Sequence, residues 1–260
     1  MPSRPRGIFC SPISRVATLA AVALLGWSVE TLATPARSNV MCREELPSAR
    51  REQLAAKLRR ITGLQELKFG DDGLLREGNA QPVGGSSSAR ELVLNAIRGR
   101  KVVVIEDASN RADIAFAQVV PGRWKTSAVN RPPVFVVQID FLDFERLVGD
   151  ELALEAFNVG WGFLHELDHV INDSPDTDLL GEAGECEAHI NQMRRESGLP
   201  ERTDYLSTPL PAADNSFRPR LVRLAFEQKE LAANKKKRYW VIWDANVVGG
   251  LERNQVVALR

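Results

Sequence analysis

The clearest chemical pattern in this chain is a pair of histidines four residues apart. The segment His165-Glu166-Leu167-Asp168-His169 has the form H-E-x-x-H. In an α-helix, residues four apart lie on the same face, so both imidazoles can bind one ion, and Zn²⁺ accepts imidazole nitrogen at about 2.0–2.1 Å. Glu166 is offset around the helix, where its carboxylate can reach a water at the metal without being a ligand. The segment therefore predicts a zinc centre with Glu166 as the catalytic base.

A third ligand is expected from the next helix along the chain. All three histidines lie between residues 165 and 189, and that helix offers four candidates: Glu182, Glu185, Glu187 and His189. We predict Glu187, because it lies at the edge of the buried face and has Asn191 one turn further on. One of that pair would bind the metal and the other would hydrogen-bond to a ligating imidazole. Glu185 and then His189 are the alternatives.

The apolar residues around the motif predict the helices that carry these side chains. A broad apolar stripe predicts a helix over 151–171, which ends in the turn-forming residues 172–176. A second helix is expected over 182–197, because Gly198 and Pro200 follow it. Within the motif, Asp168 is expected to point away from the metal.

Three aspartates between the two helices are expected to form turns. Asp173, Asp176 and Asp178 lack the spacing and the final Glu of an EF-hand calcium loop. We therefore expect them to shape the connection between the helices rather than to bind an ion.

The rest of the chain alternates helical and strand patterns, which predicts an α+β fold. A capping box, with Ser88 as N-cap and Glu91 three residues later, begins the predicted helix that ends near residue 98. The residues 221–227 and 239–244 resemble a terminal hairpin, although a helix over 221–233 competes with it. The remaining predictions are a helix within 44–62, an exposed loop over 70–87, a helix ending near 98, and strands over 101–106, 114–120 and 134–140.

Composition places the chain among ordinary globular proteins and excludes several functions. Its 260 residues are 44% hydrophobic and 26% charged, which favours a folded core. Lys plus Arg and Asp plus Glu each number 34, so nothing indicates a nucleic-acid partner. Three cysteines cannot form a dense disulfide framework. We expect Cys42 and Cys186 to remain separate thiols.

Residues 1–36 are predicted to be a signal peptide. Basic residues precede an uncharged apolar run over 16–27, which is too short to span a membrane. Cleavage is expected after Ala33 or Ala36, and residues 37–260 are expected to form one domain. We expect this domain to be periplasmic or secreted, with no membrane span after cleavage. An uncleaved N-terminal anchor is the alternative.

The motif and the acidic residue in the next helix resemble the zincin superfamily of metallopeptidases. Glu187-x-x-x-Asn191 looks like the gluzincin pattern Glu-x-x-x-Asp, with Asn in place of Asp. The stretch GECEAHINQMRRESGLPERTDY is also similar to bacterial HExxH proteins of the effector and toxin-domain kind. The resemblance covers residues 157–205. The gap between His169 and Glu187 is short for a gluzincin, and no third histidine follows at metzincin spacing.

This resemblance implies an exported zinc-dependent hydrolase that acts on a peptide or protein. His165, His169 and Glu187 would hold Zn²⁺, and Glu166 would pass the proton of a water to the leaving amine. Tyr205 is the better of the two tyrosines for stabilising the oxyanion. The implied fold is a zincin-like α+β domain with a small sheet packed on the motif helix. The alternative is a non-catalytic zincin-like binding module, which a fourth protein ligand would favour.

Overall fold

A computed structural model of the chain describes residues 38–109, 111–124, 130–179, 181–210, 221–230 and 235–248. The chain divides into two units, Met1–Pro35 and Ala36–Arg260, and everything below concerns the second. The predicted signal peptide, 1–36, lies outside the described residues. None of the helices in the described residues is long and apolar enough to cross a membrane.

The first sheet has four strands in the order β1-β4-β6-β5. They are β1 (Val40–Cys42), β4 (Val102–Asp107), β6 (Val134–Ile139) and β5 (Ala117–Pro121). The first three are parallel, and β4 and β6 are rich in Val and Ile, as is common in parallel strands. The edge strand β5 pairs with β6 in the antiparallel direction.

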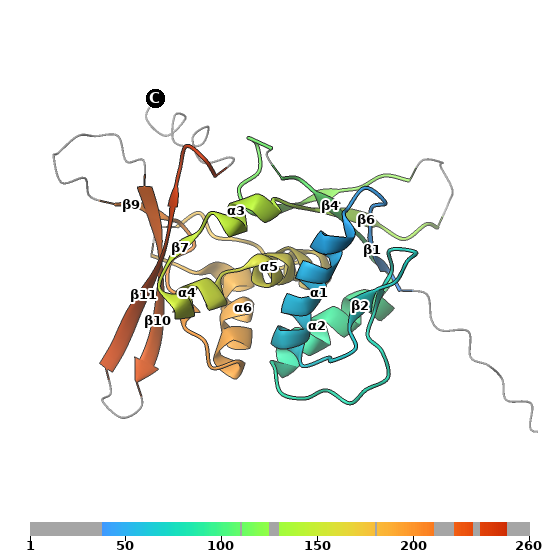
Figure 1. Cartoon of the computed structure of the whole chain (residues 1–260), viewed down its shortest axis with the longest axis horizontal. Helices are drawn as coiled ribbons and strands as arrows, with labels where there is room; N and C mark the ends of the chain where they lie inside the picture. The colour runs from blue at the N-terminus through green and yellow to red at the C-terminus, as the bar shows by residue number, and fades with distance from the viewer. Residues whose placement is uncertain are drawn as a thin grey trace, which may run out of the picture. The chain divides into compact units, whose positions relative to one another are not determined.

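Four helices gather beneath this sheet, and α5 lies among them (Figure 1). They are α1 (Ser48–Thr62), α2 (Ser87–Arg98), α5 (Val159–Asn172) and α6 (Gly184–Glu196). Helix α5 contacts α1, α2, α6, β5 and β6, and it buries Phe163, Leu164 and Leu167 completely. Gly160 permits the close approach of α1, because a Cβ there would lie 2.8 Å from the Lys57 Cβ. The motif helix is therefore held by packing on most of its circumference.

A second sheet is built on a long hairpin, as Figure 1 shows at the left. Strand β10 (Leu221–Glu230) pairs in the antiparallel direction with β11 (Lys235–Asp244), so the predicted hairpin is present and longer than expected. The short elements around it are β7 (Val148–Gly149), β8 (Glu201–Arg202), β9 (Thr208–Pro209) and α4 (Glu151–Ala156). The other described elements are β2 (Lys68–Phe69), β3 (Leu75–Arg76) and α3 (Phe141–Glu145).

The prediction of one helix over 151–171 is wrong, because α4 and α5 are separate. Asn158 stands between them in an extended conformation, and its side-chain oxygen accepts a hydrogen bond from the Gly160 N–H at 3.0 Å. This is a helix N-cap, which competes with continuing the preceding helix. The motif helix thus begins at Val159 and follows a fixed change of direction.

Two further local predictions need correction. The N-cap of α2 is Ser86 rather than Ser88, since the Ser86 hydroxyl accepts the Ala89 N–H at 2.9 Å. The Ser88 hydroxyl instead donates to Glu196 on α6. The stretch 70–87 is also not entirely an exposed loop, because Leu75 in β3 is fully buried. Because β3 is only two residues long and polar residues surround it, the sequence pattern does not predict this strand.

The coarse predictions agree with the structure. The fold is α+β, and Cys42 and Cys186 are both buried free thiols.

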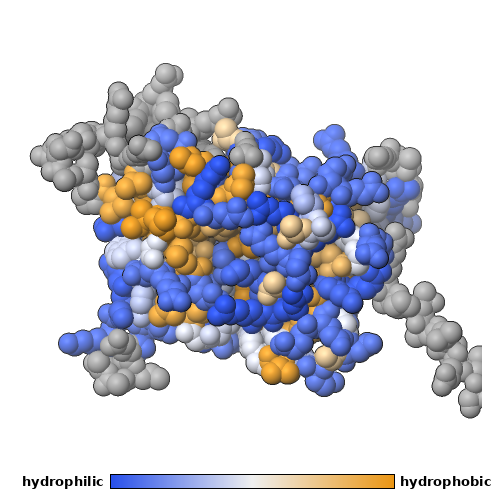
Figure 2. Space-filling view, viewed as in Figure 1, coloured by the Kyte–Doolittle hydropathy of each residue, from blue (hydrophilic) through white to orange (hydrophobic). Residues whose placement is uncertain are grey.

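Hydrophilic side chains dominate the face in Figure 2, while hydrophobic ones gather toward the side where β7 and β11 lie in Figure 1. Val148 on β7 and Leu221 on β10 are among the exposed apolar side chains.

Candidate metal centre

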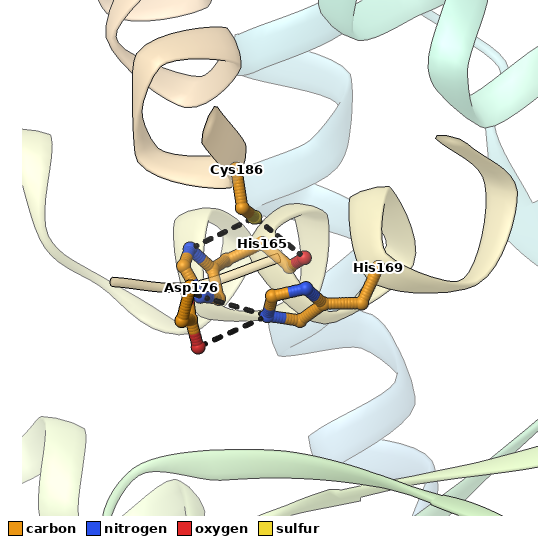
Figure 3. A group of neighbouring side chains, drawn as sticks. All are labelled: His165, His169, Asp176 and Cys186. Carbon is orange, nitrogen blue, oxygen red and sulfur yellow. Dashed lines mark hydrogen bonds and ion pairs between the residues drawn. The ribbon is translucent and has the colours of Figure 1, made fainter. Parts of the chain in front are cut away.

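Helix α5 presents both motif histidines on one face, as the four-residue spacing predicts. The two Nε2 atoms lie 3.2 Å apart, and the rings are nearly perpendicular, with an interplanar angle of 89°. Figure 3 shows both imidazoles and the Asp176 carboxylate meeting at one point. The histidine side chains are mostly buried, which restricts their orientations.

The loop after α5 returns at once to the histidines. Asp173 ends the helix in the left-handed conformation, with φ of 59°, which Asp tolerates better than most residues. Ser174 follows, and its carbonyl lies 2.6 Å from the His169 Nδ1. Because a carbonyl can only accept, Nδ1 must carry the proton. This leaves the Nε2 lone pair of His169 free for a ligand.

Asp176, in the same loop, is the third donor group, and each of its two oxygens faces a different imidazole. Its Oδ1 lies 3.1 Å from the His165 Nε2, and its Oδ2 lies 3.3 Å from the His169 Nε2. Two ligands at 2.0–2.1 Å from a tetrahedral zinc ion are separated by roughly 3.3 Å. The two nitrogens are therefore separated as two ligands of one zinc ion would be, and each Asp176 oxygen lies at a similar distance from one of them.

The remaining nitrogen of His165 faces Glu187. Its Nδ1 lies 3.4 Å from the Glu187 Oε2. Glu187 is fully buried and also binds two guanidinium groups, those of Arg194 and Arg202. Burial would raise the pKa of Glu187, but the two guanidinium groups outweigh it and hold the pKa well below its usual range. The ionised carboxylate can thus accept a hydrogen bond from the His165 Nδ1–H. This contact directs the Nε2 of the same ring toward Asp176.

The predicted third ligand is therefore not among the converging donors. The structure brings His165 and His169 together with Asp176 and Cys186, and not with Glu187. Both Glu187 oxygens are occupied by guanidinium groups. The alternatives lie elsewhere too: Glu185 is exposed, and His189 binds Asp168 at 2.9 Å.

Cys186 is the fourth member of the group that could hold a metal ion. One ligand atom from each of the four residues lies within 4.8 Å of the others. The Cys186 Sγ lies 3.4 Å from the His165 Nδ1 and also donates to the His165 carbonyl at 3.4 Å. It thus approaches the ring nitrogen that does not face Asp176. The two histidines and Asp176 are the tighter part of the group.

The electrostatics of this group favour a positive charge at its centre. Asp176 is the chief cause that raises the pKa of His169 to about 11. Burial acts against protonation of His165, but hydrogen bonds to Asp176, Cys186 and Glu187 raise its pKa well above the usual value. With both Nδ1 protons committed, two Nε2 lone pairs and a carboxylate converge. Either an additional proton or a cation must occupy the space between them.

Glu166 is a buried carboxyl group whose charge interacts with both motif histidines. Burial raises the pKa of its carboxyl, which the two neighbouring histidines partly counteract. The Val119 main-chain N–H of the edge strand β5 is a hydrogen-bond partner of Glu166. A carboxylate with a raised pKa lies closer to the pH at which proton transfer is efficient.

Tyr205 lies against the centre but not in the orientation of an oxyanion donor. Its hydroxyl donates to the Asp176 Oδ2 at 2.6 Å, and burial is the largest cause that raises its pKa. Its ring stacks on His165 at a centroid distance of 5.9 Å and an interplanar angle of 18°. Tyr205 therefore orients Asp176 and covers one face of His165.

A second layer of hydrogen bonds supports the loop from Asp168. This carboxylate is fully buried, and it accepts from the Ser174 hydroxyl, from Asn172 at 2.5 Å and from His189 at 2.9 Å. Asp168 points away from the donor group, as the sequence predicts. By holding Ser174, it positions the carbonyl that fixes the His169 tautomer.

A pocket with about 110 Å³ of free volume opens beside the motif. His165 and Glu166 form part of its wall, together with the Glu187, Arg194 and Arg202 cluster. The other lining residues are largely aromatic: Phe116, Phe144, Phe157, Trp161 and Tyr205. A group bound there would lie next to Glu166.

Sequence reasoning missed Asp176 and Cys186 as donors. Asp176 lies in a turn-forming segment, and the turn by itself is a sufficient reason for an aspartate at this position. One signal could have identified it: a carboxylate a few residues beyond the second histidine can fold back onto the exposed face of the same helix. Cys186 adjoins Glu187 in the first turn of α6, where no comparable pattern marks it.

No family model, no curated protein and no solved structure matches the chain.

Proposed function

We propose that this protein is a zinc-dependent hydrolase of the peptidase kind, with His165, His169 and Asp176 as the metal ligands. The single observation that carries the proposal is the convergence of three donor groups: the two Nε2 atoms lie 3.2 Å apart, and each faces one Asp176 oxygen, at 3.1 and 3.3 Å, which are separations that suit ligands of a tetrahedral zinc ion. Three protein ligands leave a fourth position for water or substrate, as catalytic zinc sites require.

The choice of zinc follows from the H-E-x-x-H pattern on a helix, and the types of donor argue against the alkaline-earth ions. Two neutral imidazoles and one carboxylate form a mixed nitrogen and oxygen set, whereas Ca²⁺ and Mg²⁺ take oxygen ligands almost exclusively. When bound, zinc would supply Lewis acidity, lowering the pKa of a coordinated water and polarising a substrate carbonyl.

The chain's own residues would perform the proton transfers. Glu166 would accept the proton of the attacking water and deliver it to the leaving amine. Its buried position excludes bulk water from this exchange and raises its pKa, so that it can release the proton again. Tyr205 would hold Asp176 in place through its hydroxyl.

An extended peptide could approach along β5. Among the described strands, β5 pairs only with β6, so a substrate strand could add to its other edge, where it would compete with Glu166 for the Val119 N–H. That edge runs beside α5, and its Val119 N–H faces Glu166. A substrate strand added there would bring its backbone to the metal and the base.

The second candidate is a structural metal site in a binding module. The observation that favours it is Cys186, whose thiol belongs to the same donor group. A thiolate ligand would close the fourth position and remove the place for water. Cobalt substitution separates the two candidates, since a thiolate adds a sulfur-to-cobalt charge-transfer band in the near ultraviolet that Cys186→Ser would remove.

The test of the proposal is the zinc content of the purified protein, compared with Glu166→Gln and His169→Ala. We expect about one zinc per chain in the wild type and in Glu166→Gln, but far less in His169→Ala. Peptide hydrolysis should be present in the wild type and absent in Glu166→Gln. A wild type that binds no zinc after reconstitution would overturn the proposal, and equal activity in Glu166→Gln would exclude Glu166 as the base.

A further inference from the structure

The pocket beside the motif contains an unbalanced positive charge. Arg194 and Arg202 both line it, and both form ion pairs with Glu187. Among the described residues, Glu187 is the one carboxylate paired with either guanidinium. One acidic group against two guanidinium groups leaves an excess of one positive charge. The other carboxylate of the lining, Glu166, interacts with the two histidines.

Arg194 also has donor capacity that its neighbours do not use. Its side chain is 2% exposed, so burial isolates it from bulk water. Its Nε donates to the Ala156 carbonyl at 2.9 Å, and its Nη1 donates to Glu187 and to the Asn191 Oδ1. A guanidinium group has five N–H donors. No hydrogen bond of Nη2 occurs within the part of the chain that the structure describes, although Arg194 lines the pocket.

The walls of the pocket would accommodate a short aliphatic stem. The Arg202 guanidinium lies over the Phe157 ring at 5.6 Å, and that of Arg194 lies over Trp161 at 5.4 Å. Phe116 packs edge-on against Phe157 at a centroid distance of 5.1 Å. Phe116 has a φ of 65°, an uncommon conformation for a bulky residue. The packing around Phe116 therefore maintains this strained backbone, and it keeps the ring in the wall of the pocket.

We propose that this pocket binds a carboxylate of the substrate, on the residue next to the bond that is cleaved, and that Arg194 and Arg202 recognise it. The position of the cleaved bond in this inference rests on the proposed function. The negative charge of the ligand is inferred from the pocket residues alone. The carboxylate can belong to a Glu or Asp side chain or to the C-terminus of a peptide. The first source makes the protein an endopeptidase with acidic specificity, and the second makes it a carboxypeptidase.

Matched peptides test the proposal on the wild-type protein. One pair carries Glu or Gln at a single internal position, with both ends blocked, and the Glu–Gln position is moved along the peptide. A second pair has a free or an amidated C-terminus and no acidic side chain. We expect kcat/KM to be at least about tenfold higher for one carboxylate-bearing member, because a charge-assisted hydrogen bond is lost in its neutral counterpart. Equal kcat/KM values within both pairs would overturn the proposal.

A binding measurement separates failure of the pocket from failure of the hydrolase. The ligands are N-acetyl-glutamate amide, N-acetyl-glutamine amide and N-acetyl-leucine with a free carboxylate. Their dissociation constants are measured by calorimetry or by NMR. If no peptide is cleaved but a carboxylate ligand binds at least about tenfold more tightly than the glutamine amide, the pocket assignment stands without the hydrolase. If all three bind equally or none binds, the pocket assignment is overturned.

Adjacent arginines offer a matched pair of variants. Arg194→Lys keeps the charge but removes the planar group of donors, whereas Arg195→Lys changes an exposed arginine that pairs with Glu201. We expect Arg194→Lys to reduce the preference for the carboxylate at least about fivefold, and Arg195→Lys to leave it unchanged. An undiminished preference in a folded Arg194→Lys would remove Arg194 from the assignment. Should this variant not fold, the matched peptides decide the question.

Discussion

Two carboxylates approach His165 at its two different ring nitrogens, and they have different roles. Asp176 lies 3.1 Å from Nε2, where the donors converge, while Glu187 lies 3.4 Å from Nδ1 among guanidinium groups. Asp176 is therefore a ligand in the proposed site, and Glu187 sets the tautomer and basicity of a ligand. At the scale of single residues, the distinction between these roles can be measured directly.

We predict that Asp176→Ala lowers zinc affinity by more than about a hundredfold, whereas Glu187→Gln lowers it by about 10–100-fold. Glu187→Gln should also destabilise the fold by about 3–5 kcal/mol, because it removes the charge that compensates two largely buried guanidinium groups. Competition with a zinc-binding dye and urea unfolding measure the two effects. Strong binding by Asp176→Ala together with none by a folded Glu187→Gln would return Glu187 to the ligand set.

Asp168 provides a second prediction at this scale. Asp168→Asn weakens the acceptor for Ser174 and His189, so the Ser174 carbonyl would hold the His169 Nδ1 proton less firmly. We expect zinc affinity to fall about tenfold, while Asp178→Asn, an exposed change in the same loop, has no effect. NMR of the histidine nitrogens reports the tautomer separately from stability. An unchanged tautomer and affinity in Asp168→Asn would contradict the positioning role.

At the scale of elements, Glu196 fastens α6 to the start of α2. Its carboxylate accepts the Ser88 N–H at 2.9 Å and hydroxyl groups from Ser86, Ser87 and Ser88. A negative charge at a helix N-terminus also interacts favourably with the helix dipole. Because α2 and α6 both contact α5, this contact helps to align the helices that carry the site.

We predict that Glu196→Gln lowers the free energy of unfolding by about 1 kcal/mol near neutral pH. Burial alone would raise the pKa of Glu196, but the hydrogen bonds, chiefly from Ser88, lower it to about 2. A lowered folded-state pKa gives stability that is present above the unfolded value, near 4.3, and that disappears as the pH falls through about 2. Urea unfolding should therefore show the difference shrinking between those pH values. A constant difference across that range would show that the charge does not cause it.

At the scale of the whole molecule, metal binding should stabilise the fold. The three proposed ligands come from α5 and the loop that follows it, so unfolding would disperse them. Free zinc at a hundred times its dissociation constant adds about 2.7 kcal/mol, which raises the Tm of a domain of this size by roughly 5–10 °C. Thermal unfolding with zinc and with a chelator measures this. His169→Ala is the control, and an equal rise in that variant would indicate binding elsewhere.

The sequence by itself determined the α+β class, the main helices and strands, and the pairing of His165 with His169. These features depend on residues that are close along the chain, since a spacing of four places two side chains on one helical face. Glu166 beside them follows from the same geometry. The break at Asn158 is also local, but the apolar stripe on both sides concealed it.

Only the tertiary structure decided which acidic side chain joins the histidines. Asp176 reaches them because the chain reverses at Asp173 and Asp168 anchors Ser174. Glu187, equally acidic, is held back because α6 and β8 bring Arg194 and Arg202 to it. Along the chain, both residues are carboxylates within reach of the motif. Their roles differ because each carboxylate binds the groups that folding places beside it, and the packing of α5, α6 and β8, rather than separation along the chain, decides which groups those are.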